Sequence, residues 1–164
     1  MESLWAPWRM EYIKGESPEE CIFCLKSKPE EDRQRKVLFR GEHSFVIINR
    51  YPYTNGHLMV APYRHTVNLG GFTDAELIEI HRLVSLSCDV LKDCVNPDGF
   101  NVGLNIGRVA GAGIDDHLHY HIVPRWSGDT NFMPVMADVR VVPQHLEETY
   151  EQLRAAFERF EKRA

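Results

Sequence analysis

Three histidines at alternate positions are the part of this chain best suited to chemistry. The segment reads HLHYHIV from His117 to Val123. Successive side chains of a strand point to opposite faces, so His117, His119 and His121 share one face. The tyrosine, isoleucine and valine of the segment favour a strand. Near neutral pH an imidazole can act as a nucleophile, an acid–base group or a metal ligand. The alternatives are a polar face whose histidines only bond to neighbours, and a face that only binds a metal.

A glycine-rich stretch, residues 107–113, leads directly into the histidine segment. Glycine lets backbone N–H groups approach an anion closely, and such turns can form anion-binding nests. A flexible hairpin loop would have the same composition. Next to a candidate nucleophile, the stretch predicts a phosphate group held beside His119.

A second candidate site is the pair Cys21 and Cys24, which enclose an isoleucine and a phenylalanine. A two-residue gap lets two thiolates bind one metal ion, and it also occurs in redox pairs. A chance pair is the third alternative. The sequence has no second pair with this spacing, so further zinc ligands would have to be histidines. Of the other two cysteines, Cys88 is expected on a helix, with its side chain in the protein core.

Length and composition predict one soluble domain with an ordinary core. Of the 164 residues, 43% are hydrophobic and 26% are charged, as in typical globular proteins. The net charge of −5 and the absence of a basic block argue against a nucleic-acid partner. No apolar run approaches the roughly 18 residues of a membrane span. The first ten residues lack the apolar region of a signal peptide, so we expect a cytoplasmic protein without membrane partners.

The expected elements alternate in an order that favours an α+β fold, with an antiparallel sheet and helices on one side. Strands are expected at 37–40, 43–49, 56–61, 100–106 and 117–123. A capping box at Thr73 and Glu76 predicts the start of a helix, and a last helix is expected from Pro143. Residues 26–36 are expected to form a solvated connector. The buried stripe of the first helix is expected at Leu77, Ile80, Val84, Cys88 and Leu91.

The segment from His117 to Val123 resembles the motif of the histidine triad (HIT) family at every position. Residues 44–50 and 56–60 are similar to the fragile-histidine-triad branch of that family. Residues 4–9 and 123–132 resemble bacterial diadenosine polyphosphate hydrolases and phosphorylases. The resemblance implies a HIT-like fold, with a five-stranded antiparallel sheet and two main helices, paired in a homodimer. It covers one domain over 1–164, with an N-terminal arm (1–36), a core (37–125) and a C-terminal segment with a helix (126–164).

The resemblance implies a nucleotidyl hydrolase or transferase that cleaves adenosine dinucleoside polyphosphates, such as diadenosine tetraphosphate or triphosphate. His119 would attack the α-phosphorus and form a nucleotidyl-histidine intermediate, and His121 would stabilise charge on the phosphate. Water and phosphate both stay open as the acceptor. The alternative functions are a nucleoside phosphoramidate hydrolase and a regulator that binds nucleotides without turnover.

Other site residues follow from the same resemblance, one position at a time. Asn49 would bond to the ribose hydroxyls. His57 would lie near the nucleophile, and Asn105 would reach the bridging phosphates. Ile47 and Met59 would flank the base.

The chain departs from the family pattern just before the triad. Relatives often carry a serine, threonine or glutamine there, whereas residues 111–116 contain none. We expect backbone N–H groups of Gly111 and Gly113 to assist the leaving group instead. Asp115 and Asp116 are candidates for orienting a triad histidine, or they lie on a solvated loop edge.

For the metal, the resemblance implies that His65 and His117 join Cys21 and Cys24, as in related galactose-1-phosphate uridylyltransferases. His43 is the alternative ligand. A Cys₂His₂ site has no open position, so the zinc would be structural. It would tie the N-terminal arm to the sheet and leave the other two triad histidines for the chemistry.

Overall fold

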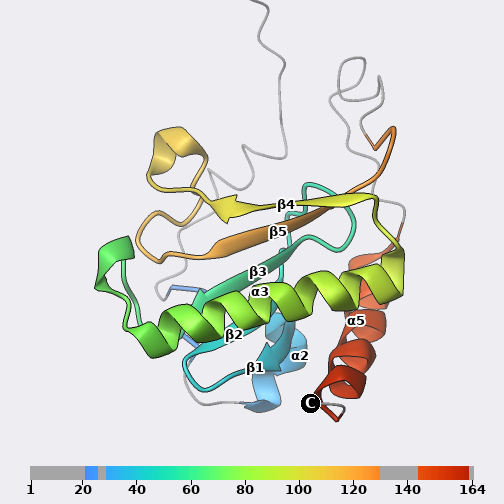
Figure 1. The fold of residues 1–164 in the computed structure, drawn as a ribbon, viewed down its shortest axis with the longest axis horizontal. Helices are drawn as coiled ribbons and strands as arrows, with labels where there is room; N and C mark the ends of the chain where they lie inside the picture. The colour runs from blue at the N-terminus through green and yellow to red at the C-terminus, as the bar shows by residue number, and fades with distance from the viewer. Residues whose placement is uncertain (1–20, 26–28, 130–143, 163–164) are drawn as a thin grey trace, which may run out of the picture.

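The computed structural model describes residues 21–25, 29–129 and 144–162. Its centre is a five-stranded antiparallel sheet in the order β1-β2-β3-β5-β4 (Figure 1). This confirms the expected α+β fold. The strands are β1 (Val37–Arg40), β2 (Ser44–Ile48), β3 (Leu58–Pro62), β4 (Gly99–Leu104) and β5 (Tyr120–Arg125). The helices are η1 (Pro29–Glu31), α2 (Asp32–Arg35), η2 (Leu69–Gly71), α3 (Asp74–Val95), η3 (Arg108–Ala110) and α5 (Leu146–Glu161).

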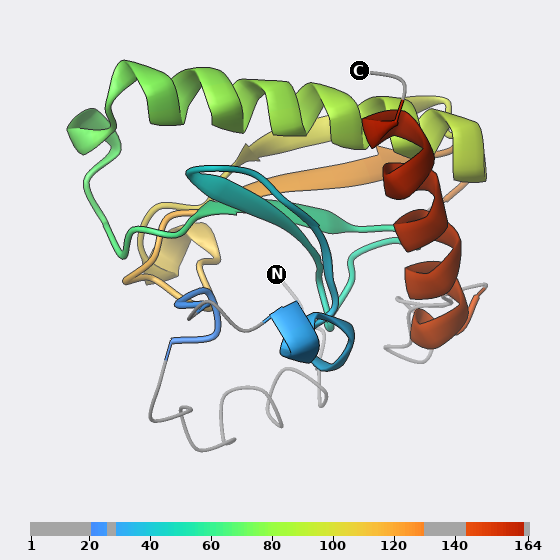
Figure 2. The ribbon, with the colours of Figure 1, turned by 90° about the horizontal axis from the view of Figure 1, so that it is seen from below.

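Strands β2 and β3 are buried on both faces, and their alternating side chains divide the core into two parts. Val46 of β2 and Val60 of β3 belong to the main core, which packs against α3 and α5. The alternate residues, Phe45 and Ile47 of β2 and Met59 and Ala61 of β3, point to the opposite face, where residues 21–25 lie. Figure 2 shows α3 along one side of the sheet and residues 21–25 on the other. We call this smaller group the second core: Phe23, Leu25, Val37, Phe45, Ile47, Met59 and Ala61.

Helix α3 begins where its capping box predicts. The side chain of Thr73 accepts from the backbone N–H of Glu76, and the Glu76 carboxylate accepts from the backbone N–H of Thr73. The expected stripe is wrong at Leu77, which is 42% exposed. Steps of three and four residues fit two adjacent stripes, and the sheet packs against the one that includes Leu83 and Val90. None of the described helices is long and apolar enough to cross a membrane.

Two expectations about local structure are wrong. The strand expected over 117–123 begins only at Tyr120, because the N–H of Leu118 donates to the carbonyl of Thr66 instead of to a neighbouring strand. The described part of the connector expected over 26–36 forms η1 and α2. Its residue Asp32 is buried and accepts a bidentate contact from Arg40. Pro143, the expected start of the last helix, lies outside the described residues.

Candidate active site and metal cluster

The second triad histidine, His119, is held in one tautomer. Its Nδ1 lies 2.8 Å from the carbonyl oxygen of His117. Because a carbonyl only accepts, Nδ1 carries the proton and the lone pair of the ring is on Nε2. Burial lowers the pKa of His119 below its usual value, since desolvation disfavours the charged form. His119 therefore carries an unprotonated nitrogen near neutral pH, as a nucleophile requires.

A chain of hydrogen bonds sets the tautomer of the third triad histidine, His121. The backbone N–H of Tyr53 donates to Nδ1 of His57 at 3.1 Å, so the proton of His57 is on Nε2. This Nε2 donates to Nδ1 of His121 at 3.0 Å. Burial, and the neighbouring His119, lower the pKa of His121 to about 4. At pH 7 His121 is therefore neutral and carries its proton on Nε2. Its ring centre lies 4.7 Å from that of His119.

Asn105 places a second donor beside His121. Its Nδ2 lies 3.4 Å from Nε2 of His121 and donates to the carbonyl of Gly111 at 3.4 Å. Two N–H groups cannot bond to each other, whereas an anionic oxygen can accept from both. Gly111 has a φ of +92°, a left-handed conformation that glycine adopts without strain. Gly113, in the same loop, is exposed.

Asn49 lies on the other side of His57 and is engaged within the protein. Its Oδ1 accepts from the backbone N–H of Tyr51 at 2.9 Å, and its Nδ2 lies 3.3 Å from Nδ1 of His57. A carboxamide has two N–H groups and two lone-pair sites. These two contacts use one of each, so Asn49 keeps a donor and an acceptor for a ligand such as a ribose.

The two residues expected to flank the base are covered by the N-terminal segment. Ile47 and Met59 are 4% and 5% exposed, in the second core with Phe23. The Phe23 ring is itself buried, and its centre lies 4.5 Å from that of His119. His119 is only 6% exposed as a result of this packing. Phe23 was not among the expected site residues, although an apolar residue between two candidate metal-binding cysteines was a signal that it packs near the site.

The four residues expected to hold a metal meet in one cluster. The ligand atoms of Cys21, Cys24, His65 and His117 all lie within 4.8 Å of one another. The His117 Nδ1 lies 3.4 Å from the Cys21 sulfur and 3.8 Å from the Cys24 sulfur, and the His65 Nδ1 lies 3.2 Å from the Cys24 sulfur. Zinc bonds of about 2.3 Å to sulfur and about 2.0–2.1 Å to nitrogen put neighbouring tetrahedral ligands about 3.6 Å apart. The cluster fits a tetrahedral zinc ion, and His43 is not among its members.

The outer nitrogens of both histidines in the cluster have partners. Nε2 of His117 donates to the carbonyl of Pro62 at 2.9 Å, which leaves the Nδ1 lone pair directed to the cysteines. Nε2 of His65 lies 3.8 Å from a carboxylate oxygen of Asp116. Such partners orient metal-binding imidazoles. Asp116 thus faces a cluster residue, whereas Asp115 pairs with Arg108 at 2.9 Å.

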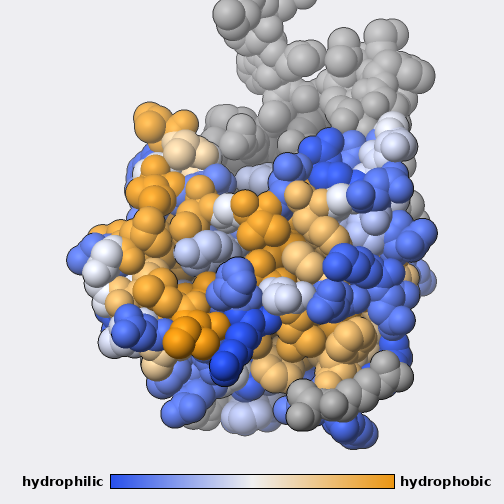
Figure 3. Space-filling view, viewed as in Figure 1, coloured by the Kyte–Doolittle hydropathy of each residue, from blue (hydrophilic) through white to orange (hydrophobic). Residues whose placement is uncertain are grey.

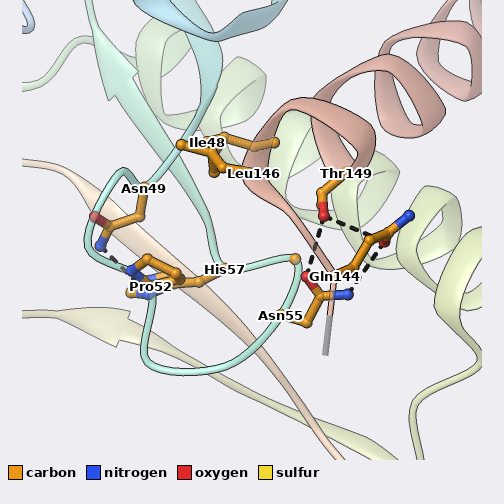
Figure 4. Close-up of a pocket in the computed structure, with 9 residues that line it drawn as sticks. Ile48, Asn49, Pro52, Asn55, His57, Gln144, Leu146 and Thr149 are labelled. Carbon is orange, nitrogen blue, oxygen red and sulfur yellow. Dashed lines mark hydrogen bonds between the residues drawn. The ribbon is translucent and has the colours of Figure 1, made fainter. Parts of the chain in front are cut away.

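A small cavity lies beside His57, between the turn after β2 and the start of α5 (Figure 4). Its volume is about 30 Å³, which suits a single water molecule rather than a nucleotide. The turn contributes Asn49, Pro52, Asn55, Gly56 and His57 to its lining. Gln144, just before α5, and Leu146 and Thr149 of α5 complete it.

Comparison with known proteins agrees with this arrangement. A family model, the HIT domain, matches residues 30–128. The chain is 38% identical over 158 residues to the AP-4-A phosphorylase of Mycobacterium tuberculosis, covering 91% of this chain and 80% of that protein. It is 30% identical over 93 residues to the bis(5'-adenosyl)-triphosphatase of Dictyostelium discoideum, covering 57% of this chain and 62% of that protein.

Among solved structures, the chain is similar to a zinc-bound histidine triad family protein from Mycobacterium smegmatis. The TM-score is 0.67 at 25% identity, and the match covers 88% of this chain and 98% of the other. The extent of the domain match and the identity to the mycobacterial phosphorylase place this chain in the HIT family.

Proposed function

We propose that this HIT enzyme cleaves diadenosine polyphosphates at the α-phosphate, with Nε2 of His119 as the nucleophile. The observation that carries the proposal is the hydrogen bond from Nδ1 of His119 to the carbonyl of His117, which leaves Nε2 unprotonated. The ring centre of His121 lies 4.7 Å from that of His119, and Nδ2 of Asn105 lies 3.4 Å from Nε2 of His121. The names of the phosphorylase and triphosphatase relatives support the choice of substrate.

The reaction would proceed in two steps. Nε2 of His119 attacks the α-phosphorus, an N–P bond forms, and the P–O bond to the leaving polyphosphate breaks. Water or inorganic phosphate then attacks the same phosphorus and releases His119. Splitting one transfer into two in this way is the advantage of covalent catalysis, and the N–H donors of His121 and Asn105 stabilise the charge on the phosphoryl oxygens.

Phe23 packs against His119 and limits the space beside it. Reacting atoms must come within about 3–3.5 Å of each other, whereas the ring centres of Phe23 and His119 are 4.5 Å apart and His119 is only 6% exposed. We infer that a bound nucleotide displaces this ring and takes its place beside Ile47 and Met59. Hydrogen exchange of residues 21–25 should then change when a non-cleavable dinucleotide binds.

The test of the proposed function is incubation of the pure protein with diadenosine tetraphosphate, with and without inorganic phosphate. Hydrolysis at the α-phosphate yields AMP and ATP, whereas phosphorolysis yields ADP and ATP. ADP that forms only in the presence of phosphate identifies a phosphorylase. If neither pair of products forms, the proposed substrate is wrong.

We propose that Cys21, Cys24, His65 and His117 hold a structural zinc ion. Four protein ligands would leave no open position for a substrate. Burial raises the pKa of the Cys21 thiol, so binding would release a proton from it. Elemental analysis of the native protein should find one zinc per chain, lost in Cys21→Ser and kept in the control Cys88→Ser. No zinc in the native protein would contradict this assignment.

We also infer that the protein is a homodimer. Among the described strands β4 is at an edge of the sheet, and its residue Val102 is 47% exposed. Figure 3 shows apolar surface on the face that carries η2, η3 and α3. Exposed edges and apolar patches of this kind are typical of interfaces. The exposed apolar residues of these three elements include Leu69, Ile78 and Val109. Sedimentation should give a dimer that Val102→Glu weakens, and a monomeric native protein would contradict the inference.

A further inference from the structure

The start of α5 contacts the turn that carries His57. The Thr149 hydroxyl, on a side chain that is almost fully buried, lies 3.1 Å from Oδ1 of Asn55, 3.2 Å from Oε1 of Gln144 and 3.1 Å from the carbonyl of His145, and its one proton is shared among these acceptors. Asn55 in turn donates from Nδ2 to Oε1 of Gln144 at 3.4 Å. Figure 4 shows these three side chains joined by hydrogen bonds, with His57 further along the same turn. Gln144 and Thr149 lie beyond residue 128, where the match to the HIT domain ends.

The turn links this contact to the tautomer of His57. Asn55 lies midway between His57 and Tyr53, whose N–H donates to Nδ1 of His57. The turn is also held by a hydrogen bond from the Thr54 hydroxyl to the carbonyl of Pro124, at 2.8 Å. Because Thr54 is held in this way, a shift of Asn55 would pass mainly to His57, on the side of Asn55 away from Thr54. It would then alter the hydrogen bond between the Tyr53 N–H and His57.

The next residue of the turn leaves little space for rearrangement. Gly56 has a φ of +75°, which favours glycine. A Cβ added at Gly56 would lie 3.0 Å from the side chain of Leu91 on α3. The turn thus packs closely against one helix and is hydrogen-bonded to another, so its conformation depends on both.

We propose that Asn55 and Thr149 are positioning residues for the catalytic pair His57 and His121. Their contact holds the turn so that Nδ1 of His57 stays within reach of its two donors, the Tyr53 N–H at 3.1 Å and Nδ2 of Asn49 at 3.3 Å. This keeps the proton of His57 on Nε2 and, through the 3.0 Å bond between the rings, the proton of His121 on Nε2 as well. The C-terminal helix is then part of the catalytic scaffold, although it lies outside the matched domain. The effect on rate rests on the proposed function, whereas the effect on the tautomers does not.

The test compares Thr149→Val, Thr149→Ser and Tyr150→Phe with the native protein. Valine keeps the shape of threonine without its hydroxyl, and serine restores the hydroxyl. Tyr150→Phe is the matched control, because it removes the neighbouring hydroxyl of α5, which donates to the carbonyl of Val37 in β1 at 3.2 Å. Imidazole nitrogen NMR reads the tautomers of His57 and His121, and kinetics with diadenosine tetraphosphate give kcat and KM.

We expect Nε2–H tautomers for both histidines in the native protein, in Thr149→Ser and in Tyr150→Phe. Thr149→Val should give mixed tautomers. Its kcat should fall about fivefold at nearly unchanged KM, because a fivefold change corresponds to one hydrogen bond of ordinary net strength. Native tautomers in Thr149→Val, or an equal change in Tyr150→Phe, would overturn the proposal. If Thr149→Val does not fold, Asn55→Ala removes the same contact from the turn. If the native protein does not cleave the dinucleotide, the proposed function fails but the NMR comparison still decides the positioning role.

Discussion

The substitution Glu76→Gln should loosen the segment that holds the first triad histidine. The Glu76 carboxylate accepts from Nε and Nη2 of Arg64, both at 2.9 Å. Arg64 is next to His65 of the metal cluster and two residues from Pro62, whose carbonyl accepts from His117. The ion pair therefore anchors the segment to the start of α3.

The magnitude follows from the pKa of Glu76. The bidentate contact with Arg64, followed by the hydrogen bond from the backbone of Thr73, lowers this pKa from 4.5 to about 2. At about 1.4 kcal/mol per unit, the shift corresponds to about 3.5 kcal/mol of stability. The side chain of Arg64 is 45% exposed, so solvent screens the pair, and we expect Glu76→Gln to cost only about 1–2 kcal/mol at pH 7. Glutamine can keep the capping hydrogen bond to Thr73.

The loss should depend on pH in a defined direction. A carboxyl group whose pKa is lowered by folding stabilises the protein above the pKa of the unfolded chain, and this contribution disappears as the pH falls through the folded value. The difference between Glu76→Gln and the native protein should therefore be complete at pH 7 and less than half as large at pH 3. Urea unfolding at both values measures it, with the exposed Glu148→Gln as a control. A loss of the same size at both pH values, or none at pH 7, would refute the reasoning.

Three further predictions concern the active site. His119→Ala should abolish turnover while the nucleotide still binds in calorimetry, and retained turnover would remove His119 from the mechanism. Because folding lowers the pKa of His119 and sets that of His121 to about 4, kcat/KM should fall in acid only below pH 6.5; a midpoint above this value in a pH profile would contradict the assignment. Phe23→Ala should lower the free energy of unfolding by about 3 kcal/mol, whereas Ile22→Ala should change it little because Ile22 is 39% exposed. Equal losses in urea unfolding would show that Phe23 does not anchor the second core.

Local patterns in the sequence predicted the parts of the fold that depend on local rules. Runs of β-prone residues predicted β2 and β3 within about two residues of their ends, and the capping box at Thr73 predicted the start of α3. The start of β5 was wrong because the carbonyl of Thr66, far away in the sequence, takes the N–H of Leu118. Helix α2 was missed because a single polar turn has no apolar period, and its residue Asp32 is buried by a partner on the next strand.

The site shows the same division between local and distant information. The spacing of Cys21 and Cys24 predicted a metal-binding pair, and the family resemblance added His65 and His117; these four side chains meet in the metal cluster. The tautomers were not predictable, because they depend on backbone groups of Tyr53, Pro62 and His117 that carry no sequence signal. The cover over His119 also depends on where a distant phenylalanine packs.

The most direct test of the central claim is to trap the intermediate. Native protein mixed with diadenosine tetraphosphate, quenched within one turnover and examined by mass spectrometry, should carry one adenylyl group on His119. His119→Ala should carry none. Turnover of the substrate by the native protein without this adduct, or with the adduct on another residue, would contradict the mechanism.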